Sequence, residues 1–497
     1  MKPSMALALL AGSAGLFVAT TVNSQDSQES EWWSPGDVHE LPAQVDYAND
    51  SGVLRVLFTD EEVRTTQNAF FQPIGANGRA CVSCHQPSDS MSLSAETARE
   101  RWDATDGRDP IFAAVDGSNC PSMPQGERAS HSLLLDYGLF RIERPWPPRD
   151  ANGAPVETDF EIEVVRDPWG CNIGDRGPDA GNISVYRRPR PVANMKYLLA
   201  IGFPQDPKLG RPVPVDPRTG EPTSGNLLAD RRALTLDAQM DDAGAAHLEM
   251  ARAMTPQQRS EITQFLMSVY AAQQRDASGT ELNANGAEGG PQYLADSPAG
   301  MLGAYGKRVW SEFEPWEQMS EEQLAELSEE EREYRASVAR GARIFRDETF
   351  LITDSAGINF PTFGNPFRQA CTMCHNMTNM GNDVAPGQID LGTQNAPFAD
   401  PAPHLPLFRV TCTGEPHPYY GTEILTHDPG FALTTGRCLD VGKITAQSLR
   451  GLAARAPYFS NGSAATLRDV VDFYDRRYNL QYTEQEKIDL VNMMGAL

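Results

Sequence analysis

The sequence predicts a mainly α-helical fold in two halves, with long loops and small β insertions. Alternation of apolar and polar residues, the pattern of half-buried strands, is scarce along the 497 residues. Proline and glycine are abundant, at 37 and 41 residues, as expected where loops are long. The same short cysteine motif begins at Cys81 and again at Cys371, with helical and loop material around each copy. We therefore expect one domain in each half.

Both copies read C-x-x-C-H, as CVSCH in the first half and CTMCH in the second, which is the attachment signature of c-type haem. Two thiols must reach the two vinyl groups of one porphyrin, and the adjacent histidine then turns its imidazole onto the iron. A zinc knuckle and a thioredoxin-like redox pair share the Cys-x-x-Cys spacing. A zinc site would need a second pair of ligands nearby in the sequence, and neither motif has one. We predict two cytochrome c-type domains, with two covalent haems held by Cys81, Cys84, His85, Cys371, Cys374 and His375.

The first residues have the pattern of a secretory signal peptide. Lys2 supplies a positive charge before an apolar run from Met5 to about Val18, and small and polar residues follow up to Ser24. We expect a signal peptide over residues 1–24 and a periplasmic protein, with an uncleaved anchor as the alternative. No later stretch approaches the roughly twenty apolar residues of a transmembrane helix. A periplasmic location agrees with the motifs, because bacteria attach c-type haem outside the cytoplasmic membrane.

The remaining cysteines and the net charge indicate the compartment and the class of partner that suit this protein. Cys120 and Cys171 in the first half, and Cys412 and Cys438 in the second, could form two disulfides, as an oxidising compartment permits. The formal net charge is −25 at pH 7. Such an acidic chain argues against nucleic acid and favours cationic or dipolar protein partners.

The domain boundaries follow from composition. Residues 276–290 (DASGTELNANGAEGG) lack periodic apolar residues, as a connector does. We place an N-terminal cytochrome c domain at 45–275, a linker at 276–319 and a C-terminal cytochrome c domain at 320–497. Prolines interrupt residues 140–164 and 204–223, which we interpret as loop or hairpin insertions.

Three helices have recognisable N-caps. Thr255, followed by proline, predicts a helix to about Gln274. Ser320 predicts an acidic helix from Glu321 to about Phe345. A capping box at Thr483 predicts the last helix of the chain.

One long segment resembles a known family. Residues 449–467 (LRGLAARAPYFSNGSAATL) are similar to LRNVALTAPYFHDGSAATL of the bacterial di-haem cytochrome c peroxidases and their relative MauG, the di-haem enzyme that matures methylamine dehydrogenase. The resemblance implies that the haem at His85 activates hydrogen peroxide. The haem at His375 would relay or store oxidising equivalents.

The resemblance also implies a second ligand for the iron at His375. The classical peroxidases have a methionine at the place where this chain has Tyr474, and MauG has a tyrosine there. Ligation by His375 and Tyr474 would lower the potential of this haem relative to a His/Met pair. The alternatives are a buried core tyrosine with Met377, Met380 or a histidine as the ligand.

Two further residues are implied to act over the first haem. Thr235 to Gln239 (TLDAQ) resembles the family's TLEEQ, and His247 to Met250 (HLEM) resembles its NPVEM. The family's glutamine and glutamate correspond to Gln239 and Glu249. A carboxylate there can take a proton from peroxide and return it to the departing oxygen. The glutamine can orient peroxide by hydrogen bonding.

The chain departs from the family at two places. Ala229 occupies the position of a tryptophan that relays electrons between the haems. Arg455 replaces a threonine of the family's inter-haem calcium site, to which Pro457 belongs and Asn194 would add an oxygen ligand. The other candidates for a distal haem ligand, each more often a surface or core histidine, are His131, His404, His417 and His427.

These features predict a periplasmic di-haem oxidoreductase that reduces hydrogen peroxide with electrons from a small redox protein. Tyr474 and Ala229 also suit an oxygenase or a MauG-like protein-modifying oxidase. From a different class, the chain could be an electron-transfer cytochrome without catalysis. Fold similarity alone does not separate these functions.

Overall fold

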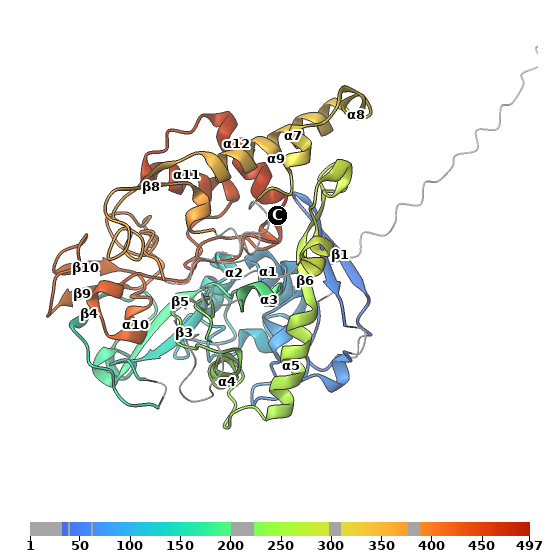
Figure 1. Cartoon of the computed structure of the whole chain (residues 1–497). Helices are drawn as coiled ribbons and strands as arrows, with labels where there is room; N and C mark the ends of the chain where they lie inside the picture. The colour runs from blue at the N-terminus through green and yellow to red at the C-terminus, as the bar shows by residue number, and fades with distance from the viewer. Residues whose placement is uncertain are drawn as a thin grey trace, which may run out of the picture.

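A computed structural model describes residues 32–37, 40–60, 63–150, 152–199, 223–297, 310–375 and 388–497 (Figure 1). The predicted signal peptide at residues 1–24 lies outside these ranges, as does most of the predicted insertion at 204–223. Among the described helices, none is both long and apolar enough to cross a membrane.

The helices and strands are distributed along the whole described chain. The α-helices are α1 (Ala95–Thr105), α2 (Ser132–Tyr137), α3 (Met195–Leu198), α4 (Leu236–His247), α5 (Pro256–Ser268), α6 (Pro291–Asp296), α7 (Glu314–Glu317), α8 (Glu321–Ala325), α9 (Glu329–Asp347), α10 (Ala432–Thr435), α11 (Leu467–Tyr478) and α12 (Glu484–Gly495). The strands are β1 (Gln44–Asn49), β2 (Gly52–Phe58), β3 (Phe140–Pro145), β4 (Phe160–Arg166), β5 (Asn182–Arg187), β6 (Val269–Asp276), β7 (Phe350–Ile352), β8 (Phe367–Gln369), β9 (Leu407–Cys412) and β10 (Glu423–Thr426).

The prediction of a mainly α-helical fold is wrong. Only 34% of the structure is helical and 18% is strand, divided among several small sheets. Strands β2 and β9 do alternate between buried and less buried residues, but over only seven and six residues. Such short patterns are ambiguous in a sequence, and one partner of each strand, β6 for β2 and β4 for β9, comes from a distant part of the chain.

The first sheet has the order β1-β2-β6 and is antiparallel. Strand β6 begins at Val269, directly after α5, so the predicted continuation of that helix to Gln274 is also wrong. The strand forms because its residues pair with β2 and are buried almost throughout. Leu54 and Val56 of this sheet pack with Phe265 of α5 and with Val82 of the first cysteine motif in one hydrophobic core.

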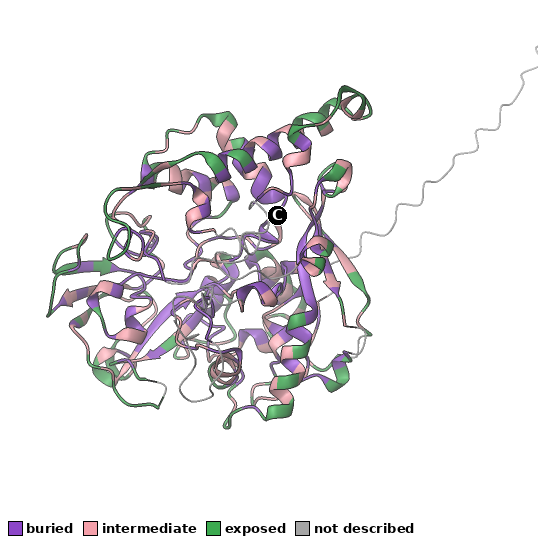
Figure 2. Cartoon of the chain, in the orientation of Figure 1, coloured by how far each residue is buried: buried purple, intermediate pink, exposed green. Residues whose placement is uncertain are grey.

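A second sheet joins segments from both halves of the chain. Its order is β10-β9-β4, and β4 pairs with β9 so that Phe160 lies opposite Cys412. The predicted insertion at 140–164 thus supplies strand β3 and most of β4. Strand β3 pairs with β5, which is almost entirely buried, as Figure 2 shows.

The second half is organised by three helices, α9, α11 and α12, which lie together in the orange and red part of Figure 1. Gly341 of α9 lies so close to the backbone of Asp489 in α12 that a Cβ atom would collide with it. The predicted acidic helix from Glu321 to Phe345 is in fact two helices, because a second capping box at Ser328 begins α9. The capping box at Thr483 is confirmed at the start of α12.

Two disulfides stabilise the loop-rich regions. Cys120 is bonded to Cys171, and Cys412 to Cys438, with a Cα–Cα distance of 5.6 Å in each pair. The predicted pairing within each half is therefore confirmed.

Candidate haem-binding sites

The two C-x-x-C-H motifs adopt the same local conformation. Each begins a 3-10 turn after an extended alanine, and the amide of the second cysteine donates to the carbonyl of the first at 3.2 Å. The four motif cysteines are free thiols, whereas the four others form disulfides. Sulfur atoms are therefore available for covalent attachment at both motifs.

The first motif holds its histidine by a backbone contact. The Nδ1 atom of His85 lies 3.0 Å from the carbonyl oxygen of Met91. An Nδ1–H donating to this carbonyl leaves Nε2 free to bind a metal. Burial lowers the pKa of His85 to about 4, which keeps the imidazole in the neutral form that a metal ligand requires.

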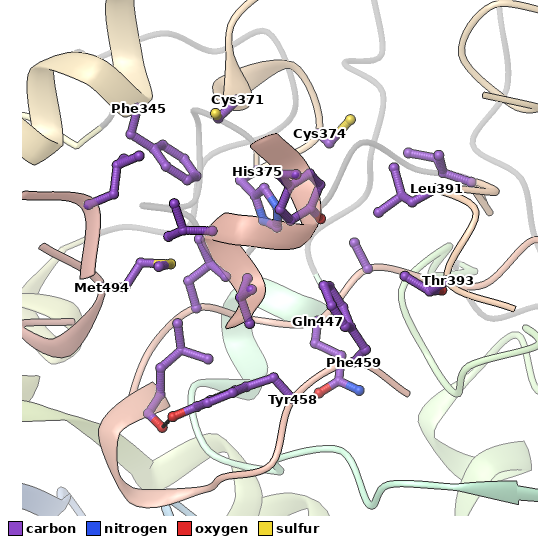
Figure 3. Close-up of a pocket in the computed structure, with 18 of the residues that line it drawn as sticks. Phe345, Cys371, Cys374, His375, Leu391, Thr393, Gln447, Tyr458, Phe459 and Met494 are labelled. Atoms are coloured by element: carbon purple, nitrogen blue, oxygen red, sulfur yellow. Dashed lines mark hydrogen bonds between the residues drawn. The ribbon is translucent and has the colours of Figure 1, made fainter. Parts of the chain in front are cut away.

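The second motif opens onto a large cavity of about 1430 Å³, its opening to solvent included. In Figure 3, Cys371 and Cys374 lie at one end of the cavity, and Gln447 and Tyr458 lie at the other. The wall is mostly apolar, with Phe345, Leu391, Phe459 and Met494 among its residues.

This cavity suits a haem. It adjoins two free thiols, and its walls would exclude water from a flat apolar macrocycle. His375 lines it, and the buried Nδ1 atom of this histidine has no hydrogen-bond partner among the described residues. Burial lowers the pKa of His375 to about 4, so this imidazole is neutral as well.

Tyr474 lines the same cavity as His375. It lies on α11, where the centroid of its ring is 6.1 Å from that of Phe459 and 6.3 Å from that of Tyr478. Burial, together with the neighbouring Tyr478, raises the pKa of Tyr474 well above its usual value. The structure thus brings together the two residues predicted to bind one iron. Their coordination of that iron stays a prediction, and the alternative ligands Met377 and Met380 lie outside the described residues.

The predicted distal pair lies near the first motif. Gln239 is half-buried on α4, and Glu249 is exposed just after it; neither side chain forms a hydrogen bond with a described residue. The amide of Ala76, in the loop that leads to Cys81, donates to the carbonyl of Leu248 at 3.0 Å. Glu249 itself has a φ of +53°, an unfavourable backbone conformation for a glutamate. Such strain is common at functional sites, but it is no test of the proposed role.

A buried network beside the first motif was not predicted from the sequence. Nδ1 of His247 lies 2.5 Å from Oδ2 of Asp116, whose other oxygen pairs with Arg79, two residues before Cys81. Burial raises the pKa of Asp116, but Arg79 and His247 outweigh this effect and the net shift is downward. The charge of His247 also lowers the pKa of His85. The one sequence feature that could have indicated this network is His247, which begins the HLEM segment.

The position matched to the family's tryptophan lies where the halves meet. The carbonyl of Ala229 accepts a hydrogen bond from the amide of Thr445 at 2.9 Å. The next residue, Asp230, is fully buried and pairs with Arg187 and Arg232. Arg187 also pairs with Asp428 of the second half at 2.6 Å, so an ion-pair network spans this junction.

The residues suggested for calcium do not fit that ion. The carboxamide of Asn194 is used by Ala271, donating to its carbonyl at 2.9 Å and accepting from its amide at 3.2 Å. Arg455 places a buried cation in the region, and Pro457 lines the cavity. Within the described residues, no three His, Cys, Asp or Glu side chains are grouped to hold a metal.

The four remaining candidate histidines have other contacts. His131 is buried with both ring nitrogens near backbone carbonyls. Nδ1 of His427 faces the carbonyl of Pro406 at 2.8 Å. His404 stacks on Tyr137, and His417 stacks on Tyr420. None of the four lines the described cavity.

Comparison with curated proteins identifies relatives among the peroxidase-like haem oxidoreductases. The chain is 33% identical over 150 residues to cytochrome-c peroxidase IdrP1 of Pseudomonas sp. (strain SCT), covering 26% of this chain and 37% of the relative. It is 35% identical over 107 residues to cytochrome-c peroxidase IdrP1 of Denitromonas iodatirespirans, covering 18% and 28%. The resemblance to bacterial cytochrome c peroxidases is therefore confirmed, and the matches span 37% and 28% of the length of these two relatives.

Other comparisons add little. No protein-family model matches the chain. Hydrazine synthase of Kuenenia stuttgartiensis aligns with a TM-score of 0.29 and 16% identity, over 69% of this chain and 77% of that one. A MauG-like protein associated with microbial copper homeostasis aligns with a TM-score of 0.28 and 19% identity, over 58% and 77%. At these TM-scores, neither alignment supports an argument about this chain.

Proposed function

We propose that this protein is a periplasmic di-haem c-type oxidoreductase that reduces hydrogen peroxide with electrons from a small redox protein. The main supporting observation is the pair of C-x-x-C-H turns with free thiols, one of which opens onto a cavity shared by His375 and Tyr474. The curated relatives named cytochrome-c peroxidase support the same activity. The disulfides and the sequence pattern of residues 1–24 support an oxidising compartment.

Each residue of the proposed sites has a distinct role. Haem, when bound, supplies an iron that can exchange electrons. The motif cysteines would hold the two groups covalently, and His85 and His375 would bind the irons. Glu249 would accept a proton from hydrogen peroxide and return it to the departing oxygen, while Gln239 orients the substrate. Two electrons from the redox partner and two protons from solvent then balance the reduction of hydrogen peroxide to two waters.

The test is hydrogen-peroxide-dependent oxidation of a reduced small cytochrome c by the purified, haem-loaded protein. Glu249→Gln should lower turnover by about 10²–10⁴-fold, the usual contribution of a general acid–base group. Glu100→Gln, at an exposed position of α1, is the matched control and should leave the rate unchanged. Absorption spectra of both haems should be the same in all three proteins.

Two results would contradict this proposal. An unchanged rate in Glu249→Gln would exclude the acid–base role of that residue. A wild-type protein with both haems and no turnover would exclude the peroxidase itself.

A second candidate is a MauG-like protein-modifying oxidase or an oxygenase. The observation that favours it is Tyr474 in the cavity of His375, together with Ala229 in place of the relay tryptophan. Oxygen uptake with a lipophilic substrate would support an oxygenase. Six-coordinate low-spin iron at both haems in every redox state would instead indicate a non-catalytic electron-transfer cytochrome.

A further inference from the structure

Three arginines lie together between the halves of the chain. Arg188 and Arg190 follow strand β5 in the first half, and Arg455 belongs to the cavity wall in the second. The side chains of Arg188 and Arg455 are buried, at 6% and 4% exposure, and Arg190 is partly buried.

The hydrogen bonds of these arginines lead to the wall of the second cavity. Nη2 of Arg188 donates to the carbonyl of Arg455 at 2.7 Å. Arg190 donates to the carbonyl of Thr445 at 3.0 Å and to that of Ala446 at 2.8 Å, and both acceptor residues line the cavity. The first half therefore places two guanidinium groups behind the wall of a site in the second, where they bond to its main chain.

Arg455 is the central member of the cluster. Its Nη2 donates to the carbonyl of Ser448, and its Nη1 lies 3.4 Å from the Oε1 atom of Gln447. Its Nε atom is buried and has no hydrogen-bond partner among the described residues. A buried donor without a partner indicates that an acceptor belongs there.

Within the described residues, no carboxylate forms an ion pair with any of the three arginines, although the buried Asp89 acts on Arg188 without forming an ion pair with it. The preceding residue, Arg187, is by contrast paired with both Asp428 and Asp230, at 2.6 and 2.7 Å. Uncompensated buried charges are among the most costly features of a folded protein, so an anion is expected beside them.

The pKa values agree with this description. Burial lowers the pKa of Arg188 to about 9 and that of Arg190 to about 10, and repulsion by Arg455 adds to both shifts. Burial also lowers the pKa of Arg455 to about 10. Because guanidinium groups remain charged in proteins, the shifts reflect burial of three neighbouring positive charges, which Asp89 offsets only in part at Arg188.

The orientation of the cavity indicates which anion fits. In Figure 3, Cys371 and Cys374 occupy one end of the cavity and Gln447 the other. The vinyl groups that react with cysteine lie on the edge of the porphyrin opposite its two propionates. A haem attached at Cys371 and Cys374 would therefore have its carboxylates on the side of Gln447, the residue that Arg455 contacts.

The same segment also reaches the first motif. The amide of Val192 donates to the carbonyl of Met91 at 3.0 Å, and this carbonyl is the partner of His85. The hydroxyl of Ser92 donates to the carbonyl of Pro189 at 3.1 Å. Residues 188–192 thus connect the loop of the first haem site to the wall of the second.

We propose that Arg455 binds a propionate of the haem at His375, and that Arg188 and Arg190 act with it as the fixed cations between the two haems, in a place where the residues do not suit calcium. This inference rests on the proposed function in that it requires both haems. The positive cluster favours the reduced, less positive state of the nearby iron, so it raises the midpoint potential of the haem at His375.

The experiment is spectroelectrochemical titration of the haem-loaded protein. Arg455→Gln should shift the ratio of oxidised to reduced second haem at least tenfold toward the oxidised form, which is a fall of about 59 mV for a one-electron couple. Arg190→Gln changes the partly exposed arginine of the cluster and should shift this ratio in the same direction. Arg455→Lys retains the charge and should restore most of the wild-type potential.

Two controls make the result specific. Arg166→Gln also removes a guanidinium that donates to main-chain carbonyls, those of Ala402 and Leu405, but on strand β4, and it should leave both potentials unchanged. A calcium chelator should change neither potential. These readouts do not require peroxidase turnover.

Contradictory outcomes are distinguishable. Unchanged potentials in both Arg455→Gln and Arg190→Gln, with two haems per chain, would overturn the inference and leave the proposed function standing. A stoichiometric calcium ion whose removal changes the potentials would also overturn the inference while leaving the proposed function standing. A purified wild-type protein without covalent haem would overturn both.

Discussion

Asp230→Asn should strongly destabilise the fold. The carboxylate of Asp230 is fully buried and lies 2.7 Å from Nη1 of Arg187 and 2.8 Å from Nη1 of Arg232. Nε of Arg144 is 3.4 Å away. Burial raises the pKa of Asp230, but the three arginines outweigh it and hold the pKa well below its usual value.

The magnitude follows from the partners that remain. Asparagine has nearly the same shape as aspartate but no charge. Arg187 would keep Asp428 and Arg232 would keep Asp242, whereas Arg144 has no other carboxylate within ion-pair distance among the described residues. Two charge-assisted hydrogen bonds of about 1.5–3 kcal/mol each are weakened. A loss of about 3–5 kcal/mol is therefore expected, as for other broken buried ion pairs.

The assay is guanidinium chloride unfolding followed by far-UV circular dichroism, with wild type and variant compared at equal m-value. Asp106→Asn is the matched control, because its pair with Arg108 is exposed, at 84% and 76% of the two side chains. That control should cost less than about 1 kcal/mol. A loss this small in Asp230→Asn would refute the reasoning, since it would mean that the arginines do not depend on this carboxylate.

The same residue predicts the response to acid. Because the folded-state pKa of Asp230 is depressed, its contribution to stability is complete above the unfolded value of 3.8 and is lost as the pH falls through the folded value. Wild type and Asp230→Asn should therefore converge in stability at strongly acidic pH. Unfolding midpoints measured down through this range would check the convergence.

Three further predictions concern other parts of the molecule. Burial raises the pKa of Asp89 to about 7, so between 3.8 and about 7 stability should fall as the pH rises, by up to about 1.4 kcal/mol per unit, and Asp89→Asn should flatten this slope in unfolding titrations. Replacing Cys120 and Cys171 by alanine opens a loop of 51 residues and should cost about 4 kcal/mol in the same unfolding assay, with little loss contradicting the loop-entropy argument. Tyr474→Phe removes the phenol oxygen and should change the absorption spectrum of the second haem but not the first; identical spectra would exclude iron ligation by Tyr474.

Local features of the structure could be predicted because short-range chemistry decides them. The capping box at Thr483 and the helix start at Thr255 need only residues three positions apart. The cysteine pairing within each half followed from proximity along the chain. The C-x-x-C-H motifs specify an attachment chemistry by spacing alone, and the placement of Tyr474 beside His375 followed from a long matched segment.

Other features depended on contacts that no local pattern contains. The end of α5 at Ser268 is set by pairing of the next residues with β2, more than 200 positions earlier in the chain. Strand β4 belongs to a sheet because β9 lies beside it. The prediction that the helix continues from Val269 to Gln274 was wrong because a strand needs a partner strand. The packing of the whole chain decides which strand that is.

The sequence by itself determined the chemistry of this protein: two attachment motifs, four further cysteines that pair, and a segment similar to the cytochrome c peroxidases. Only the tertiary structure decided where charge is compensated. Arg187 and Arg188 are adjacent in the chain, yet among the described residues the first forms ion pairs with two carboxylates and the second forms none. Successive residues of an extended chain point in opposite directions, so their electrostatic environments are set by which distant segments pack on each side.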